Sequence, residues 1–146
     1  MLKPLEQWIC DVCGEIIECP EEGYVVWSVD TDLRSHSFKI IHQGKCDDRH
    51  TDSSIALPDL LGLNGMSQLL ALITVGPLKQ PERYGGNTGV KDLEEYVDLF
   101  RRLQVPHYEA ARQRFRDPDI LERFYDSNEV YPYRPDVLER IASGKG

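Results

Sequence analysis

Two apolar runs in the first third of the chain have the length and residue types of β-strands. Residues 24–29 (Tyr-Val-Val-Trp-Ser-Val) are rich in aromatic and β-branched side chains, and residues 38–42 (Phe-Lys-Ile-Ile-His) form a second such run. The polar stretch from Asp30 to Ser37 separates them and is expected to form the hairpin loop. The pattern predicts a small antiparallel hairpin, with a short strand before it at residues 16–18. A sheet this small is not expected to be stable alone.

After residue 56 the apolar positions follow a helical spacing. Residues 64–75 carry apolar side chains on most positions after Asn64, the expected N-cap, which predicts a central helix buried in the core. A second helix is expected over residues 90–103, with Thr88 as its cap and an Asp98–Arg102 pair along its surface. Prolines at first helical positions predict further helices beginning at residues 106, 118 and 135, and a single helical turn near residue 58.

Cysteine and histidine flank the predicted hairpin with a spacing typical of metal ligands. Cys10 and Cys13 are separated by two residues, twenty-eight residues follow, and His42 and Cys46 are separated by three. Zinc accepts thiolate and imidazole ligands and closes a tetrahedron with four of them. Gly14, directly after Cys13, can adopt the positive φ that a tight turn at this point requires. The sequence therefore predicts one structural Zn²⁺ ion bound by Cys10, Cys13, His42 and Cys46.

This stretch resembles the metal-binding knuckle of zinc-ribbon and treble-clef domains, and the resemblance covers residues 8–46 only. Rubredoxins share the C-x2-C-G turn, but they bind iron with four cysteines, whereas His42 replaces one of them here and favours zinc. The expected fold is α+β. A small N-terminal zinc-clipped antiparallel β-hairpin module (residues 1–50) packs on four or five helices (residues 51–146), and we expect a single domain.

Two other interpretations of the cysteines remain open. They could be core thiols or disulfides, although the N-terminal residues carry no apolar segment typical of a signal peptide, which favours a reducing cytoplasm. His50 is the rival of His42, because it also stands four residues from Cys46. We prefer His42, which ends an apolar strand that can direct it at the knuckle. Cys19 precedes Pro20 in a predicted turn and is expected not to bind metal.

The charges narrow the choice of partners. The net charge of −8 opposes long-range attraction to nucleic acid or to anionic lipid, and no apolar run approaches the length of a membrane span. Against this background, five arginines and a single glutamate lie between residues 101 and 116, with Arg123 just beyond them. A surface for nucleic acid or an acidic partner is one interpretation of Arg101–Arg123. Solvated helix surface with ion pairs is the other, and it fits the scatter of Arg112 and Arg114 over different helix faces.

Acidic residues beside the proposed zinc site raise the question of catalysis. Asp47, Asp48, His50 and Asp52 could form a second metal site or an acid–base pair, as in a metal-dependent hydrolase. Four protein ligands on zinc, however, leave no open position for water, which is typical of a structural site. The sequence therefore favours a small zinc-binding accessory protein that interacts with other proteins. The alternatives are a nucleic-acid-associated regulator using Arg101–Arg123 and, third, an enzyme.

Overall fold

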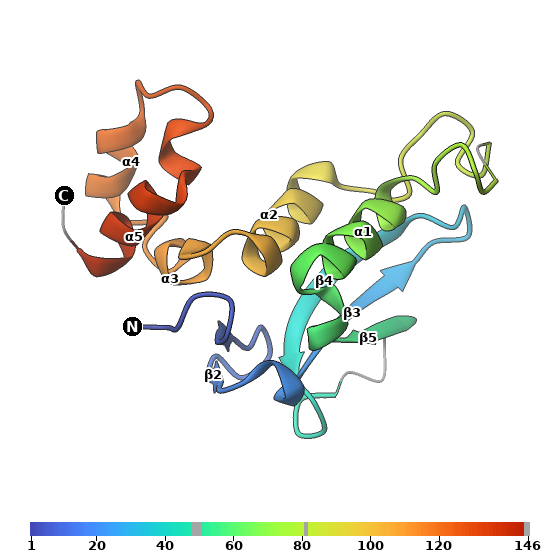
Figure 1. Cartoon of the computed structure of the whole chain (residues 1–146), viewed down its shortest axis with the longest axis horizontal. Helices are drawn as coiled ribbons and strands as arrows, with labels where there is room; N and C mark the ends of the chain where they lie inside the picture. Colours follow the sequence, from blue (N-terminus) through green and yellow to red (C-terminus); the bar gives the residue numbers. More distant parts are fainter. Residues whose placement is uncertain (48–50, 81, 145–146) are drawn as a thin grey trace.

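Two small antiparallel sheets form the N-terminal part of the protein (Figure 1). The computed structural model describes residues 1–47, 51–80 and 82–144. Strand β1 (Trp8–Ile9) pairs with β2 (Ile16–Ile17), and β3 (Gly23–Val29) lies between β4 (Ser35–His42) and β5 (Ser53–Ala56). The β3–β4 pair confirms the predicted hairpin. Strand β5 has no counterpart among the predicted strands; its Ser53 and Ser54 pair with the backbone of Trp27 and Val26.

The α-helices lie in the rest of the chain, so the α+β fold class is confirmed. Pro58 and Pro132 lie in the short 3-10 helices η2 (Leu57–Leu60) and η3 (Tyr131–Tyr133), and η1 (Pro20–Glu22) precedes β3. The α-helices are α1 (Gly62–Ile73), α2 (Leu93–Gln104), α3 (Tyr108–Arg112), α4 (Pro118–Phe124) and α5 (Pro135–Ser143). Helices α4 and α5 begin at the predicted prolines, and Asp117 caps α4 by accepting a hydrogen bond from the Asp119 amide at 3.0 Å.

Helix α1 differs from the prediction in its cap and in its burial. It begins at Gly62 after Leu61, so Asn64 lies inside the first turn instead of capping it. The expectation of a buried helix is wrong: Leu63 is 82% exposed and Leu70 is 51% exposed, whereas Leu69 is fully buried. The reason is its position, because α1 packs one face against η2 and α2 and leaves the opposite face open.

Helix α2 also begins later than predicted. Asp92 is its N-cap and accepts a hydrogen bond from the Glu95 amide at 3.2 Å. Val90 is not helical because it forms an isolated bridge with Ser35 of β4. The Thr88 hydroxyl donates to the Val90 carbonyl and not to a helical amide, so the predicted Thr88 cap is wrong.

The larger of two hydrophobic cores joins the sheet to α1 and α2. The ring of Phe38 stacks on Trp27 at 5.6 Å between centroids and meets Tyr96 of α2 edge-on at 5.2 Å. The Tyr96 hydroxyl in turn donates a hydrogen bond to the Leu69 carbonyl of α1. Trp8 is fully buried, and its indole N–H donates to the Arg102 carbonyl at 2.8 Å.

A second core lies among α3, α4 and α5, which form the group at the left of Figure 1. Its buried side chains are Tyr108, Ala111, Ile120, Val137, Leu138 and Ile141. No helix in the described part of the chain is long and apolar enough to cross a membrane.

Buried ion pairs connect the two cores. Arg102, 3% exposed, donates from Nε to Glu109 Oε1 at 2.7 Å and from Nη1 to Asp11 Oδ2 at 2.7 Å. The predicted Asp98–Arg102 salt bridge is therefore not formed. Asp98 accepts hydrogen bonds from the Tyr108 hydroxyl at 2.6 Å and from Arg112 Nη2 at 2.9 Å. Arg102 and Asp98 of α2 thus each bind side chains from outside this helix.

Candidate metal centre

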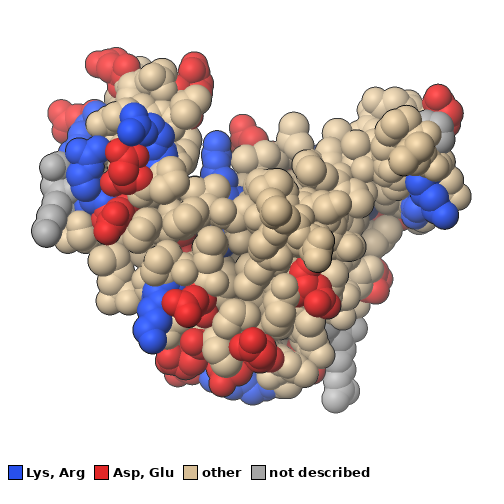
Figure 2. All heavy atoms as spheres, in the orientation of Figure 1, with Lys and Arg blue, Asp and Glu red and all other residues tan. Residues whose placement is uncertain are grey.

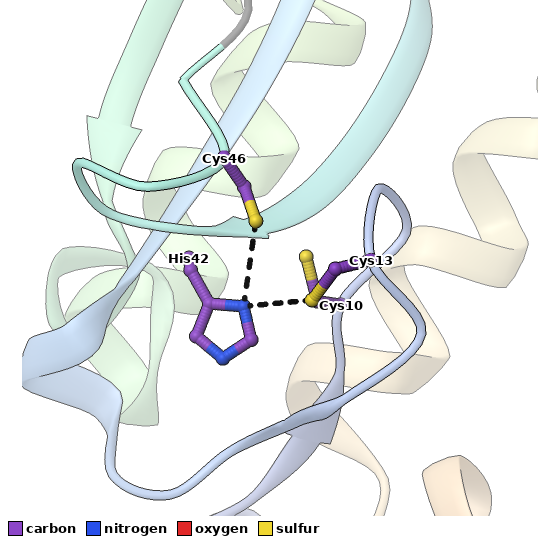
Figure 3. Close-up of side chains that lie close together, drawn as sticks. All are labelled: Cys10, Cys13, His42 and Cys46. Atoms are coloured by element: carbon purple, nitrogen blue, oxygen red, sulfur yellow. Dashed lines mark hydrogen bonds between the residues drawn. The ribbon is translucent and has the colours of Figure 1, made fainter.

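Cys10, Cys13, His42 and Cys46 converge on one point (Figure 3). One potential ligand atom from each lies within 4.8 Å of all the others. His42 Nδ1 is 3.4 Å from Cys13 Sγ and 3.7 Å from Cys46 Sγ. Cys10, His42 and Cys46 are buried, whereas Cys13 faces the surface. A group of three thiols and one imidazole at this separation could hold a metal ion.

The first pair of thiols is positioned by a tight turn. The Gly14 amide donates to the Cys10 carbonyl at 3.0 Å, and the Cys10 amide donates to the Glu15 carbonyl at 2.9 Å. The Val12 amide points at the sulfur of Cys10, 3.4 Å away. Gly14 has φ +77°, a left-handed conformation that other residues adopt only with strain. The conformation predicted for Gly14 is thus confirmed.

The second pair stands at the end of β4 and in the turn that follows. The Gln43 amide donates to the Glu22 carbonyl at 2.7 Å, which fixes the chain directly after His42. Gly44 has φ +84°, and its amide donates to Asp47 Oδ1 at 3.0 Å. This turn returns Cys46 toward His42, as Figure 3 shows.

A hydrogen bond selects the tautomer of His42. Its Nε2 lies 3.0 Å from the Ile16 carbonyl oxygen, which can only accept. The proton therefore resides on Nε2, and the lone pair of Nδ1 is directed at the thiols. Metal-binding histidines are commonly oriented in this way by a hydrogen bond from the other ring nitrogen.

Asp11 attaches the Cys10–Cys13 turn to the rest of the fold. Its amide donates to the Ile40 carbonyl at 2.8 Å, and its Oδ2 accepts from the Ile40 amide at 2.8 Å. The same oxygen receives Arg102 Nη1, and Arg102 Nη2 donates to the Ile9 carbonyl at 3.1 Å. Sequence reasoning missed this support for the site. The available signal was an arginine three positions after Leu99, on the apolar stripe of α2.

The thiols differ in acidity. Burial raises the pKa of Cys10, but hydrogen bonds from the backbone around Cys13 and Val12 outweigh it and lower the pKa to about 6. Burial raises the pKa of Cys46, and the neighbouring thiols Cys10 and Cys13 add to this, to about 11. The group therefore loses its first proton easily and later ones with difficulty, unless a cation compensates the charge.

The remaining residues near the site have other partners. Cys19 is partly buried and outside the four-residue group. Asp47 binds the Gly44 amide, and Asp52 Oδ2 accepts from the Val29 amide at 2.8 Å, so both have structural roles. Asp48 and His50 lie outside the described residues, and the choice between His50 and His42 stays a prediction.

The predicted arginine cluster is largely dispersed. Arg102 is buried, Arg112 pairs with Asp98 at 2.9 Å, and Arg114 pairs with Asp117 at 3.2 Å. Arg101 is placed over the ring of Tyr133, 4.0 Å from its centroid. Figure 2 shows basic and acidic side chains intermixed over the α4–α5 end of the molecule, with no continuous basic face in this view.

One arrangement was not anticipated from the sequence. His36 lies between the Ser37 hydroxyl, 2.8 Å from Nδ1, and Asp30 Oδ1, 2.9 Å from Nε2. This is the order of a serine–histidine–carboxylate relay, but Ser37 is exposed on the sheet and Asp30 also pairs with Lys91. A nucleophilic serine needs an enclosed substrate site, so the contacts alone do not indicate hydrolysis.

No protein-family model, curated protein or solved structure matches the chain. The four converging ligand side chains are accordingly the strongest indication of what this protein binds.

Proposed function

We propose that this protein is a zinc-binding accessory protein in which zinc is structural and the helical part contacts partner proteins. The observation that carries the metal assignment is the orientation of His42, whose Nδ1 faces three cysteine sulfurs while Nε2 is engaged with a backbone carbonyl. Soft thiolates with one imidazole favour zinc over magnesium or calcium, which prefer oxygen.

The distances support a tetrahedral ion. Zinc lies about 2.3 Å from sulfur and about 2.0–2.1 Å from imidazole nitrogen, so sulfur and nitrogen ligands on adjacent corners are about 3.6 Å apart. The separations of 3.4 and 3.7 Å from His42 Nδ1 agree with this. All four ligand atoms lie within 4.8 Å of one another, so the group has to contract by no more than about 1 Å to close the tetrahedron.

A structural role follows from the number of ligands. Four protein ligands complete the coordination of zinc and leave no position for a substrate or an activated water. The site joins the Cys10–Cys13 turn to the end of β4, in addition to the two hydrogen bonds between Asp11 and Ile40. Because the ligands must be reduced thiols, we expect the protein to work in a reducing compartment such as the cytoplasm.

The alternative of a nucleic-acid-associated regulator has weaker support. It depends on free cations on one surface, and Arg102, Arg112 and Arg114 are engaged in ion pairs within the protein.

Elemental analysis of the purified full-length protein tests the metal assignment. We expect about one zinc per chain, and a loss of most of it in Cys10→Ser and in His42→Ala. Cys19→Ser is the matched control and should keep its zinc. Iron in place of zinc, or unchanged zinc in both ligand variants, would overturn the assignment.

A further inference from the structure

The core among α3, α4 and α5 is open on one side. A groove of about 340 Å³ runs along it, lined mainly by Phe115, Leu121, Phe124, Tyr125, Pro132 and Tyr133. Tyr125 is 86% exposed and Leu121 is 59% exposed, and the two stand four residues apart at the end of α4. Large apolar side chains gathered at an open groove are typical of a surface that binds a partner.

One wall of the groove is held in place by contacts within the protein. Tyr133 meets the ring of Phe115 edge-on, with 6.4 Å between centroids, and the guanidinium of Arg101 covers the same tyrosine. Phe115 in turn contacts the buried Tyr108 at 5.4 Å. The groove is therefore preformed, and a ligand would not have to order this wall on binding.

A basic pocket adjoins the apolar groove. This pocket, about 230 Å³, shares Phe124 and Ile141 with the groove and is also lined by Arg123, Arg140, Ser127 and Tyr131. Among the described residues, neither lining contains an aspartate or a glutamate. Arg123 and Arg140 have no carboxylate within 4 Å in the part of the chain that the structure describes, although Arg123 attracts Asp117 from farther away.

We propose that the groove and the basic pocket together bind an acidic segment of a partner protein. A bulky apolar side chain of that segment occupies the groove beside Leu121 and Tyr125, and a carboxylate next to it binds Arg123 and Arg140. An apolar groove lies beside two guanidinium groups that form no close ion pair among the described residues. This combination carries the assignment, because a carboxylate bound by arginine forms strong, charge-assisted hydrogen bonds. This binding site rests on the proposed function, because it assumes that the protein acts by interacting with other proteins.

The same features argue against a nucleic acid as the occupant. A strand of nucleic acid needs a series of cations along its backbone, and this site offers two at one end of an apolar groove. A peptide with alternating apolar and acidic side chains satisfies both parts of the site at once.

Display of random twelve-residue peptides tests the proposal on the full-length, zinc-loaded protein. We expect the selected peptides to combine acidic residues with a bulky aromatic or aliphatic one. A labelled peptide from this set should bind about tenfold more weakly, or worse, to Arg123→Glu/Arg140→Glu. Leu121→Ser/Tyr125→Ser should weaken it similarly. All four side chains are exposed, so the fold should persist, as circular dichroism will show.

Lys79→Glu/Arg83→Glu is the matched control, because it changes the net charge equally at exposed positions remote from α4 (Figure 1). It should bind the peptide like the unaltered protein. The proposal would be overturned if no peptides were selected, if the selected peptides were basic, or if the control weakened binding equally. Binding of an oligonucleotide through Arg123 and Arg140 would also overturn it. Zinc content measured on the same samples separates this failure from a failure of the metal assignment.

Discussion

Arg102 shows how a single residue connects the candidate metal centre to the helices. Burial lowers the pKa of Arg102, but the hydrogen bonds and charges of Glu109 and Asp11 outweigh this and raise it. The guanidinium therefore stays charged in the interior and touches both the Cys10–Cys13 turn and α3. A buried charge of this kind is tolerated only while its partners are present.

Removal of Glu109 tests that network. Glu109→Ala should lower the free energy of unfolding by about 3–5 kcal/mol, because it leaves the Arg102 guanidinium buried with only part of its neutralising charge. Chemical denaturation of both proteins measures the difference. Asp136→Ala, which breaks the exposed pair with Arg134, is the control and should change stability little. Equal effects of the two substitutions would contradict the assigned role of Arg102.

The contribution of Asp98 to the free energy of unfolding should depend on pH. Burial raises the pKa of Asp98, but hydrogen bonds from Arg112 and Tyr108 outweigh it and leave the pKa below its usual value. Since folding lowers this pKa, its stabilisation is complete above the unfolded-state value of about 3.9 and is lost as the pH falls toward the folded-state value. The free energy of unfolding should fall less steeply below pH ~4 in Asp98→Asn. Identical slopes for the two proteins would rule this contribution out.

At the scale of elements, the N-terminal sheets are small, and the four candidate metal ligands lie in the turns beside their strands or, for His42, at the end of β4. β1 and β2 contribute two residues each, and the loop from β4 to Cys46 is held by turns. Helices α3, α4 and α5 bury apolar side chains in a separate core. Loss of the metal should therefore act on one part of the chain more than on the other.

Hydrogen exchange measures this difference. In Cys13→Ser, the amides of residues 8–46 should exchange faster, whereas those of α4 and α5 should change little. Cys19→Ser, outside the four-residue group, should leave both regions unchanged. Uniform acceleration over the whole chain, or none in the hairpin, would show that the centre does not stabilise these sheets selectively.

Replacement of Gly65 in α1 by alanine should change stability in the opposite direction to most glycine-to-alanine substitutions in helices. Replacing a mid-helix glycine by alanine usually stabilises a helix by about 0.5–1 kcal/mol. A Cβ atom on Gly65, however, would lie 2.0 Å from the carbonyl carbon of Leu60, so η2 would have to move. Gly65→Ala should instead destabilise the protein by about 1–3 kcal/mol, measured as a lower melting temperature. Ser67→Ala on the exposed face is the control, and a stabilised Gly65→Ala protein would show that the contact relaxes.

Elements with strong local signals could be predicted from the sequence, and those set by distant contacts could not. Pro118 and Pro135 predict helix starts because proline fixes φ, and Gly14 predicts a left-handed turn. Strand β5 has no such signal, since Ser53 and Ser54 acquire their conformation from pairing with β3. The convergence of Cys10, Cys13, His42 and Cys46 followed from their spacing, whereas Asp11 and Arg102, ninety-one residues apart, meet only in the folded chain.

At the scale of the whole molecule, the net charge and the distribution of arginines determine whether nucleic acid is attracted. The chain carries a net charge of −8, and the clustering of arginines along the sequence does not become a basic surface in the fold. Three of the five arginines between residues 101 and 116 form ion pairs: Arg102, Arg112 and Arg114. A fourth, Arg101, lies over the Tyr133 ring. Arg116 is the remaining one of the five and is exposed.

We therefore predict that the protein does not bind nucleic acid tightly at physiological salt. Each phosphate contact contributes about 0.9 to the slope of log affinity against log salt, and one exposed arginine from this stretch supports few contacts. Titration of labelled single- and double-stranded nucleic acid at ~0.15 M salt measures the affinity. Saturable binding tighter than micromolar, lost in Arg116→Glu but kept in Arg83→Glu, would reverse the conclusion. It would show that Arg116 joins cations from other elements on one surface, and the regulator would then become the better account of the protein.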